Sequence, residues 1–503
     1  MRSVLTLVCV GLCLQAAATS AAPPPNAAVL LDAAIDAMGG RAVLEGVRAV
    51  RIDSIGHDFA LEQSERPEGP HLVSYQQARE IRDHANARLW RKDELRNWSF
   101  ADWRPSTVVF ADGVLAVPRG DRWRALRADQ RGAFERDLAL APERLLLTAR
   151  AAGDLKSAPE RVLHGIPNDA VAFTFAGVPY TLYLNRDTHL PTMLMSVADD
   201  RLGIWGDVVT ERWYGFWSLQ PGGWFYPQQV STTWNGIPSG DRTVLKIDVN
   251  PEVDEALFAI PEDTRVAFRA TESAPPASLQ TVTLDVSRAI RMTPDIVVLP
   301  GAWAVTLVRQ ADGIVVLEAP IGSAYSAQVI AAASTIFPSM GIKAVVTTSD
   351  AWPHLGGVRE YVARGIPVFA LDLNVPILER LVAARYTTMP DRLARHPRAA
   401  TWIEVSETTT IGEGQTRIDL IPVRGGGSER MMVAHLPGVN LLYASDLLQN
   451  ARDGSGFFHP AYAAELAVAM KREGIQGIAQ AWAMHMDPIP WSTVTEALAA
   501  LGR

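Results

Sequence analysis

The sequence predicts an antiparallel, β-rich α+β half followed by an α/β half in which two sheets are sandwiched between helices. In the first half, short alternating or apolar segments are separated by turn signals such as Asp112-Gly113 and Asn235-Gly236. The polar stretch Thr271–Ser278 contains two prolines and is typical of an extended linker. Beyond this stretch, apolar strands alternate with helical segments, which favours an α/β fold.

Length and composition support more than one folded unit. A chain of 503 residues is too long for one ordinary core, because domains commonly run to ~100–200 residues. The hydrophobic content of 48% and the charged content of 20% are those of a soluble globular protein. The net charge is −8, the isoelectric point is about 5.7 and no Lys/Arg cluster stands out, so nucleic acid is not an expected partner.

The first 22 residues have the order of a secretory signal peptide. Arg2 precedes an apolar run at Val4–Leu14, and small residues then lead to Pro23-Pro24-Pro25, so we expect cleavage near Ala21. An uncleaved anchor is the alternative, although the apolar run is short for a membrane span, which needs ~20 residues. We therefore expect a periplasmic or secreted protein with no stable membrane span after cleavage.

Both cysteines of the chain, Cys9 and Cys13, lie inside this segment, so the mature protein should contain none. No cysteine is then available as a metal ligand or nucleophile. The predicted organisation is a signal peptide at 1–21, a β-rich domain at 22–270, a linker at 271–280 and an α/β domain at 281–503.

The first half should contain two helices and a series of strands. Ala27–Met38 has helical spacing and stops at Gly39-Gly40, and a long helix is expected at Arg131–Ala152. The expected strands are Ala49–Ile55, Thr107–Phe110, Val171–Phe175, Thr181–Leu184, Val208–Tyr214, Gln229–Trp234 and Val244–Val249.

Tryptophans are concentrated in this half, where a curved antiparallel sheet could line its concave face with them. Ordinary sheet packing is the favoured interpretation, and a ligand groove is the alternative. The segments Trp224–Gln229, Val249-Asn250-Pro251 and Leu257–Pro261 loosely resemble the half-barrel domains of periplasmic lipoprotein-sorting proteins. That resemblance implies a surface for an apolar ligand or for presenting a substrate.

The second half reads as a regular succession of strands and helices. A hairpin is expected at the Asp312-Gly313 turn. The expected strands are Val305–Val308, Ile314–Leu317, Ala344–Thr347, Ile366–Leu371, Ile418–Pro422, Met431–His435, Val439–Ala444 and Ile478–Ala481. The expected helices are Ala324–Phe337, Gly356–Arg364, Val375–Ala384, Ala461–Glu473 and Trp491–Leu501.

The stretch Val345–Val358, VVTTSDAWPHLGGV, is the most informative of the chain. A buried strand ends in a polar turn, and His354-Leu355-Gly356-Gly357 then opens an amphipathic helix. Sheets of α/β proteins place their chemistry at such strand-to-helix turns. This turn resembles the signature T-H-x-H-x-D-H-x-G-G of the metallo-β-lactamase-fold hydrolases.

The resemblance covers roughly residues 298–503 and implies an αββα sandwich. Within the signature only the last histidine, His354, is kept, while Ser349 and Ala351 stand at the two first-site histidines and Pro353 at the aspartate. The middle histidine of the family is replaced by Gly427 in the stretch RGGGSER, and Glu318-Ala319-Pro320 replaces the usual D-T-G.

Two further ligand positions are kept. Asp446 follows the strand that ends in Ala444 and falls on the family's bridging metal ligand, and His485 falls on a second-site ligand. Serine, alanine and glycine cannot supply the three nitrogens of the first zinc site. Two histidines and one carboxylate can hold a single divalent ion, namely zinc, manganese or iron, with open positions for water or substrate.

The resemblance therefore implies an exported hydrolase with metal ligands His354, Asp446 and His485 and catalytic residues Asp350, His354 and Asp446. Asp350 is a candidate fourth ligand or base, and a metal-bound water would have a pKa near ~7. The expected substrate is a small ester, lactone, amide or thioester. The first half would present this substrate or bind an apolar ligand.

Two other interpretations remain open. In a metal-free pseudoenzyme, acting as a periplasmic binding or scaffolding protein, His354 and Asp446 would cap helices, and His485 would be an ordinary core histidine. In a rebuilt site without metal, Ser349, Asp350 and His354 supply the residue types of nucleophilic catalysis. His435 and His459 are weaker candidate ligands.

Overall fold

The computed structural model describes residues 26–61, 69–97, 100–199, 205–275, 281–451, 454, 456–500 and 502. The predicted signal peptide with Cys9 and Cys13 and part of the predicted linker, residues 276–280, lie outside the described residues. Within the described ranges, the structure contains no helix with the length and apolar character that crossing a membrane requires.

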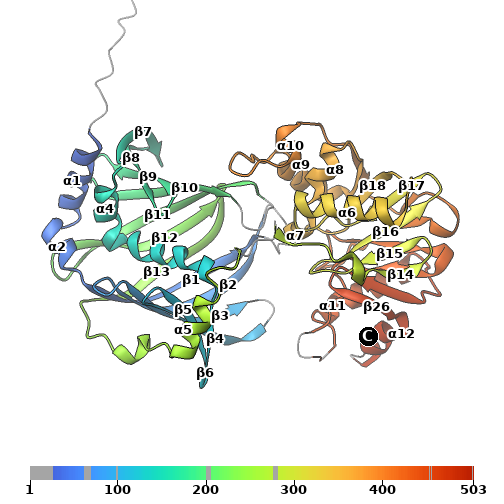
Figure 1. Cartoon of the computed structure of the whole chain (residues 1–503), viewed down its shortest axis with the longest axis horizontal. Helices are drawn as coiled ribbons and strands as arrows, with labels where there is room; N and C mark the ends of the chain where they lie inside the picture. Colours follow the sequence, from blue (N-terminus) through green and yellow to red (C-terminus); the bar gives the residue numbers. More distant parts are fainter. Residues whose placement is uncertain are drawn as a thin grey trace, which may run out of the picture.

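The first half forms one antiparallel sheet of 13 strands that curves strongly (Figure 1). The strand order is β6-β5-β4-β3-β2-β1-β13-β12-β11-β10-β9-β8-β7. The strands are β1 (Ala49–Ala60), β2 (Leu72–Asp83), β3 (Arg88–Asn97), β4 (Phe100–Ala111), β5 (Val114–Arg119), β6 (Arg122–Ala125), β7 (Lys156–Leu163), β8 (Ile166–Phe175), β9 (Val178–Asn185), β10 (Pro191–Asp199), β11 (Asp207–Gln220), β12 (Trp224–Trp234) and β13 (Ile237–Val249).

Helices pack on this sheet through apolar stripes. They are α1 (Ala27–Ala37), α2 (Arg41–Gly46), α3 (Arg131–Ala139), α4 (Pro142–Ala151) and α5 (Glu262–Arg269). In α1, Leu31, Ala34 and Ile35 recur at helical spacing and join a buried cluster with residues of α4, β8 and β12. Asn26 caps the start of α1, where its side chain accepts a hydrogen bond of 2.8 Å from the Ala28 amide.

The predicted long helix at Arg131–Ala152 is wrong, because the structure divides it into α3 and α4. Pro142 is the first residue of α4, and Ala141 before it is extended at φ −60° and ψ 146°. Proline cannot donate an amide to a helix, and it disfavours helical geometry in the residue before it. Pro142 and Glu143 at the start of α4 are buried.

The second half contains two further sheets with the orders β14-β15-β16-β17-β18-β19-β20 and β21-β22-β23-β24-β25-β26. The first consists of β14 (Ile290–Thr293), β15 (Ile296–Leu299), β16 (Val305–Gln310), β17 (Gly313–Leu317), β18 (Ile342–Thr347), β19 (Val368–Leu371) and β20 (Trp402–Val405). The second consists of β21 (Thr409–Ile411), β22 (Ile418–Pro422), β23 (Met432–Leu436), β24 (Leu441–Tyr443), β25 (Gln480–Ala483) and β26 (Met486–Pro490).

Both sheets contribute to a common buried cluster. Val298, Val315 and Val346 of the first sheet share it with Leu420 and Tyr443 of the second. Successive residues of a strand point to opposite faces, so the neighbouring Val345 joins a different cluster beneath the helices. Strands buried on both faces explain the continuous apolar runs seen in the sequence.

The helices of this half are α6 (Ser323–Ile336), α7 (Trp352–Leu355), α8 (Val358–Ala363), α9 (Val375–Ala383), α10 (Arg392–Arg395), α11 (Pro460–Arg472) and α12 (Trp491–Ala500). Residues of α6 to α9 pack with the first sheet, and residues of α11 and α12 pack with the second (Figure 1). The hairpin at Asp312-Gly313 is confirmed by the pairing of β16 with β17.

One helix boundary beside the key turn was predicted wrongly. A helix was expected to begin at Gly356, whereas α7 already begins at Trp352 and is followed after Gly356-Gly357 by α8. Pro353 lies in the first turn of α7, where its missing amide costs nothing. His354 therefore lies inside a short helix.

Candidate metal centre

Three polar side chains converge at one edge of the second half. His354 lies in α7 after β18, Asp446 follows β24, and His485 lies between β25 and β26. One ligand atom from each residue lies within 4.8 Å of the other two. Strands β24 and β25 run parallel, so the turns after them meet at the same edge of the sheet.

Each imidazole is held through its Nδ1 atom. Nδ1 of His354 lies 2.9 Å from the Ser349 hydroxyl, and Nδ1 of His485 lies 3.2 Å from the Ala302 carbonyl oxygen. This arrangement leaves Nε2 of each ring for a ligand. Such outer partners fix the orientation of metal-binding histidines.

The electrostatics of the centre favour neutral imidazoles beside a crowded carboxyl group. Burial, together with His485, lowers the pKa of His354 well below its usual value, and burial also lowers the pKa of His485. Burial and the neighbouring charge of Asp350 raise the pKa of Asp446 to about 7. A divalent cation would remove the charge crowding, and neutral imidazole is the form that binds metal.

The donor set fits a single divalent ion. Nε2 of His485 and Oδ1 of Asp446 are 3.3 Å apart, and this oxygen is buried without a hydrogen-bond partner among the described residues. Two ligand atoms ~2.05 Å from a tetrahedral zinc lie about 3.3 Å from each other. The observed spacing is therefore compatible with two ligands of one ion.

Among the described residues, no histidine takes the place of the three first-site histidines that the metallo-β-lactamase-fold signature has at the positions of Ser349, Ala351 and Gly427. Ser349 and Ala351 are buried. The Gly427 amide donates to Oε1 of Glu465 at 3.0 Å, and a Cβ atom added at Gly427 would lie 2.6 Å from the Tyr462 ring. A side chain the size of imidazole does not fit at Gly427 unless this loop moves.

A buried polar network next to the centre was not predicted. The Thr348 hydroxyl is hydrogen bonded to the Glu318 carboxyl group and lies 2.7 Å from the Ser445 hydroxyl. Burial raises the pKa of Glu318 to about 8, although the hydroxyl groups of Thr348 and Tyr443 oppose this rise. Glu318 and Ser445 both have left-handed backbones, at φ 79° and 54°, a strain that is often found near functional sites.

The capping interpretations of His354 and Asp446 are not supported. Residues 446–449 form a turn and irregular structure rather than the start of a helix, and His354 lies within α7 rather than at its N-cap. Ser349 is fully buried, which leaves its hydroxyl without the access that a nucleophile needs. His435 lies on β23 and His459 precedes α11, and neither belongs to the cluster at the centre.

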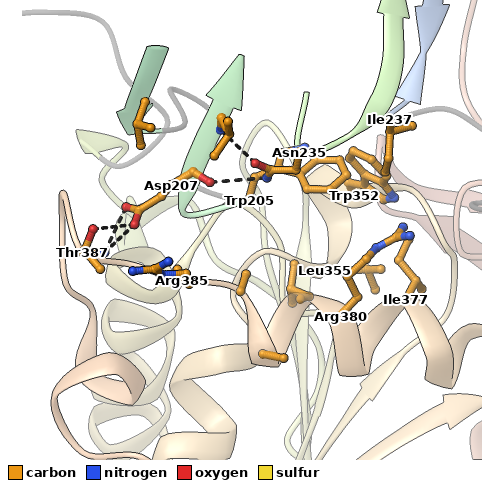
Figure 2. A pocket seen from close by; sticks show the side chains of 15 residues that line it. Trp205, Asp207, Asn235, Ile237, Trp352, Leu355, Ile377, Arg380, Arg385 and Thr387 are labelled. Carbon is orange, nitrogen blue, oxygen red and sulfur yellow. Dashed lines mark hydrogen bonds between the residues drawn. The ribbon is translucent and has the colours of Figure 1, made fainter. Parts of the chain in front are cut away.

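Apart from the candidate metal centre, helix α7 also lines a cavity of about 520 Å³ between the two halves (Figure 2). Trp352 of α7 meets Trp205 in an edge-to-face contact with ring centroids 3.7 Å apart. The Arg380 guanidinium lies 5.7 Å and 5.8 Å from these two rings. At the other end of the cavity, Asp207 accepts a hydrogen bond from the backbone of Thr387 (Figure 2). It also accepts one from the backbone of Thr388.

The tryptophans of the first half mostly follow the favoured prediction of sheet packing. Trp224 is 1% exposed in the cluster that joins α1 and α4 to the sheet, while Trp90 and Trp123 pack against another buried cluster. A cavity does occupy this half, but charged side chains rather than aromatic ones dominate its walls.

No family model and no curated protein matches the chain. Solved structures that resemble it include a metallo-β-lactamase from Pontibacter korlensis, with a TM-score of 0.34, 14% identity and coverage of 44% of this chain and 100% of that chain. A metallo-β-lactamase from Hirschia baltica has a TM-score of 0.31 and 13% identity, covering 42% of this chain and 96% of that one. A mono-zinc metallo-β-lactamase from Pseudomonas aeruginosa has a TM-score of 0.33 and 12% identity, covering 44% and 95%.

Proposed function

We propose that the second half is an αββα hydrolase of the metallo-β-lactamase type that holds one divalent ion at His354, Asp446 and His485. The observation that carries this proposal is the convergence of three ligand atoms, from three separate turns, within 4.8 Å. The two neutral imidazoles and the buried carboxyl oxygen form a donor set suited to zinc, manganese or iron.

The protein side chains have distinct roles in this proposal. Ser349 and the Ala302 carbonyl orient the two imidazoles. Asp350 lies close enough to Asp446 to raise the pKa of Asp446, and in this proposal Asp350 is the base that accepts a proton from water. The ion, when bound, would lower the pKa of water toward ~7 and polarise a carbonyl oxygen.

The proposed substrate is a small ester, lactone, amide or thioester. We also propose that the halves correspond to two domains, at 22–270 and 281–503, and that the protein is exported to the periplasm or the medium. A small-molecule partner is consistent with the net charge of −8 and with the absence of a Lys/Arg cluster in the sequence.

Elemental analysis of the purified mature protein tests the proposal most directly. We expect about one equivalent of zinc, manganese or iron, and the loss of both the metal and ester or lactone hydrolysis in Asp446→Asn. The matched control His435→Gln, on β23 outside the cluster, should keep both. Less than about a tenth of an equivalent after growth in supplemented medium would rule out a metal hydrolase.

A metal-free binding or scaffolding protein is the second candidate. It is favoured by Ser349 and Ala351, which are buried side chains that are not metal ligands, and by Gly427, where the Tyr462 ring leaves no room for an imidazole. It is also favoured by the burial of His354, which is only 1% exposed. On this interpretation, His354→Ala and Asp446→Ala change the stability of the protein and leave its cellular function intact. Turnover of any ester that a chelator abolishes would refute it.

A further inference from the structure

A separate cavity of about 630 Å³ lies on the curved sheet of the first half, outside the candidate metal centre. Strands β1, β2, β3, β11, β12 and β13 contribute its walls, and Asp137 of α3 and Pro142 of α4 also line it. All the side chains that line this cavity belong to described residues. Its walls carry four arginines together with acidic, tyrosine and amide side chains, which is unusual for a space inside a sheet.

Part of this charge is already neutralised by direct pairing. Arg82 forms ion pairs with Glu80 and with Glu143, the latter at 3.2 Å, and His84 lies 2.9 Å from Glu143. Burial would raise the pKa of Glu143, but the Arg82 and His84 charges outweigh it and lower the pKa to about 2. Arg91 pairs with Glu80 and Asp93 at 3.4 Å each. These groups need no ligand.

Two opposite charges in the same cavity remain unpaired. Arg212 of β11 and Asp137 of α3 both line it, and neither makes an ion pair within the part of the chain that the structure describes. Arg212 lies near enough to the Tyr214 hydroxyl to oppose the rise that burial causes in the pKa of that group. Their charges are near enough to influence each other, since Asp137 contributes to the raised pKa of Arg212. A guanidinium and a carboxylate that do not meet directly leave room for a molecule between them.

Further polar atoms in the cavity lack partners. Tyr214 lies two residues from Arg212 on the same face of β11, and it is 6% exposed with no hydrogen bond to its hydroxyl from any described residue. Oε1 of Gln76 is also buried without a hydrogen bond in the described ranges. Buried polar atoms are normally hydrogen bonded, so each of these requires water or a ligand.

We propose that this cavity binds a small carboxylate that also carries hydroxyl or ammonium donors. The carboxylate pairs with Arg212 and Tyr214, and the donor groups face Asp137 and the Gln76 oxygen. An apolar ligand, as implied by the resemblance to lipoprotein-sorting domains, would leave these charges desolvated and unpaired, at a high cost in free energy. A sugar acid and the free carboxyl end of a peptide share the required chemistry.

Titration calorimetry on the full mature protein, with D-glucuronate and L-alanyl-L-alanine as probes, tests the proposal. D-glucose and L-alanyl-L-alanine amide serve as matched probes without a carboxylate. We expect at least one carboxylate probe to bind and to raise the melting temperature, and its carboxylate-free counterpart to bind at least about tenfold more weakly. Binding of glucuronate alone identifies a sugar acid, binding of the dipeptide alone identifies a peptide end, and binding of both shows that the carboxylate is recognised by itself.

Substitutions separate a binding role from a structural one. Arg212→Gln should weaken probe binding at least about tenfold while the unliganded protein melts at or above the wild-type temperature, because an unpaired, partly buried charge is costly. Arg82→Gln should lower the melting temperature, because it leaves Glu80 and Glu143 uncompensated. Arg79→Gln is the matched control, since Arg79 pairs with Asp53 on the outer face of β2 and should keep probe binding.

The proposal is overturned if neither carboxylate binds at ~10 mM, a concentration at which even a weak ion-paired ligand is detectable. It is also overturned if Arg212→Gln binds the probes as the wild type does, or destabilises the protein as strongly as Arg82→Gln. None of these measurements depends on metal at His354, Asp446 and His485, so the two proposals stand or fall separately.

Discussion

The hydroxyl group of Ser349 lies 2.9 Å from Nδ1 of His354, within the turn that joins β18 to α7. In the sequence Ser349 stands where the resembling family has a first-site histidine, yet here it supports a remaining candidate ligand. Ser349 can therefore orient the His354 imidazole.

Ser349→Ala should weaken metal binding about 10–100-fold without removing it, since outer partners of ligating histidines have effects of this size. Competition with a chromophoric chelator measures the affinity. Ser334→Ala, which removes a hydroxyl bonded to the Ile330 carbonyl on α6, is the control and should leave the affinity unchanged. Equal affinities of Ser349→Ala and the wild type would show that His354 needs no such support.

The stabilising contribution of protonated Glu318 to the free energy of unfolding of the metal-free protein should decrease as the pH rises. The Glu318 folded-state pKa of about 8 lies above that of an unfolded chain, so the folded protein keeps this proton over a window in which the unfolded chain has lost it. The stabilisation that this proton provides is complete below pH ~4, falls as the pH rises, and is lost once the pH passes 8. The free energy of unfolding should therefore fall by up to about 1.4 kcal/mol per pH unit between pH ~4 and 8.

Glu318→Gln keeps the shape of the side chain and removes this proton, so the fall should become shallower by about one proton. Urea denaturation of chelator-treated protein at a series of pH values measures the slope. Glu404→Gln, at an exposed position on β20, is the control and should keep the wild-type slope. Identical slopes for Glu318→Gln and the wild type would mean that Glu318 is ionised in the folded protein.

The contact between the two sheets of the second half includes one buried hydrogen bond. Nε1 of Trp482 on β25 donates to the Thr306 hydroxyl on β16 at 2.8 Å, and both residues are fully buried. Thr306→Val has the same shape but leaves the indole N–H unsatisfied, so it should destabilise the protein by about 1–3 kcal/mol in chemical denaturation. Thr306→Ser keeps the hydroxyl and should cost less, and the reverse order would contradict this account.

The candidate ligands could be named from the sequence through the family resemblance, which places each of them after a short apolar strand. His354, Asp446 and His485 come from strand ends, and parallel or adjacent strands bring such ends together. The role of Glu318 was not accessible in the same way. The environment of Glu318 is made by residues that are distant in the sequence. Thr348 lies 30 positions from Glu318, and Ser445 lies 97 positions from Thr348.

Strands β2 and β3 were missed for a related reason. Glu80, Arg82 and Arg91 point into the charged cavity, so these strands lack the apolar face that alternation normally reveals. Their partners in the ion-pair network include Glu143, far along the chain. Alternation of apolar and polar residues therefore gives no signal for β2 and β3, whose inward face is charged.

The junction of the two halves depends on a close backbone approach at Gly206. A Cβ atom at this residue would lie 2.2 Å from the Arg385 carbonyl oxygen, and φ is +68°. The adjacent Asp207 amide donates to the same oxygen at 2.7 Å. Gly206→Ala should separate the segment at Arg385 from β11 and expose Trp205, which is 9% exposed in the wild type.

Gly236→Ala is the matched control, because Gly236 has a similar φ of +82° but no atom within 4 Å of the added Cβ. Both variants carry the backbone cost of a left-handed alanine, about 1–2 kcal/mol, and only Gly206→Ala adds the steric clash. Gly206→Ala should therefore be less stable than Gly236→Ala by about 1–3 kcal/mol, with tryptophan fluorescence shifted to the red. If the two variants had equal stability and the same fluorescence, the contact at Arg385 would contribute nothing to holding the halves together.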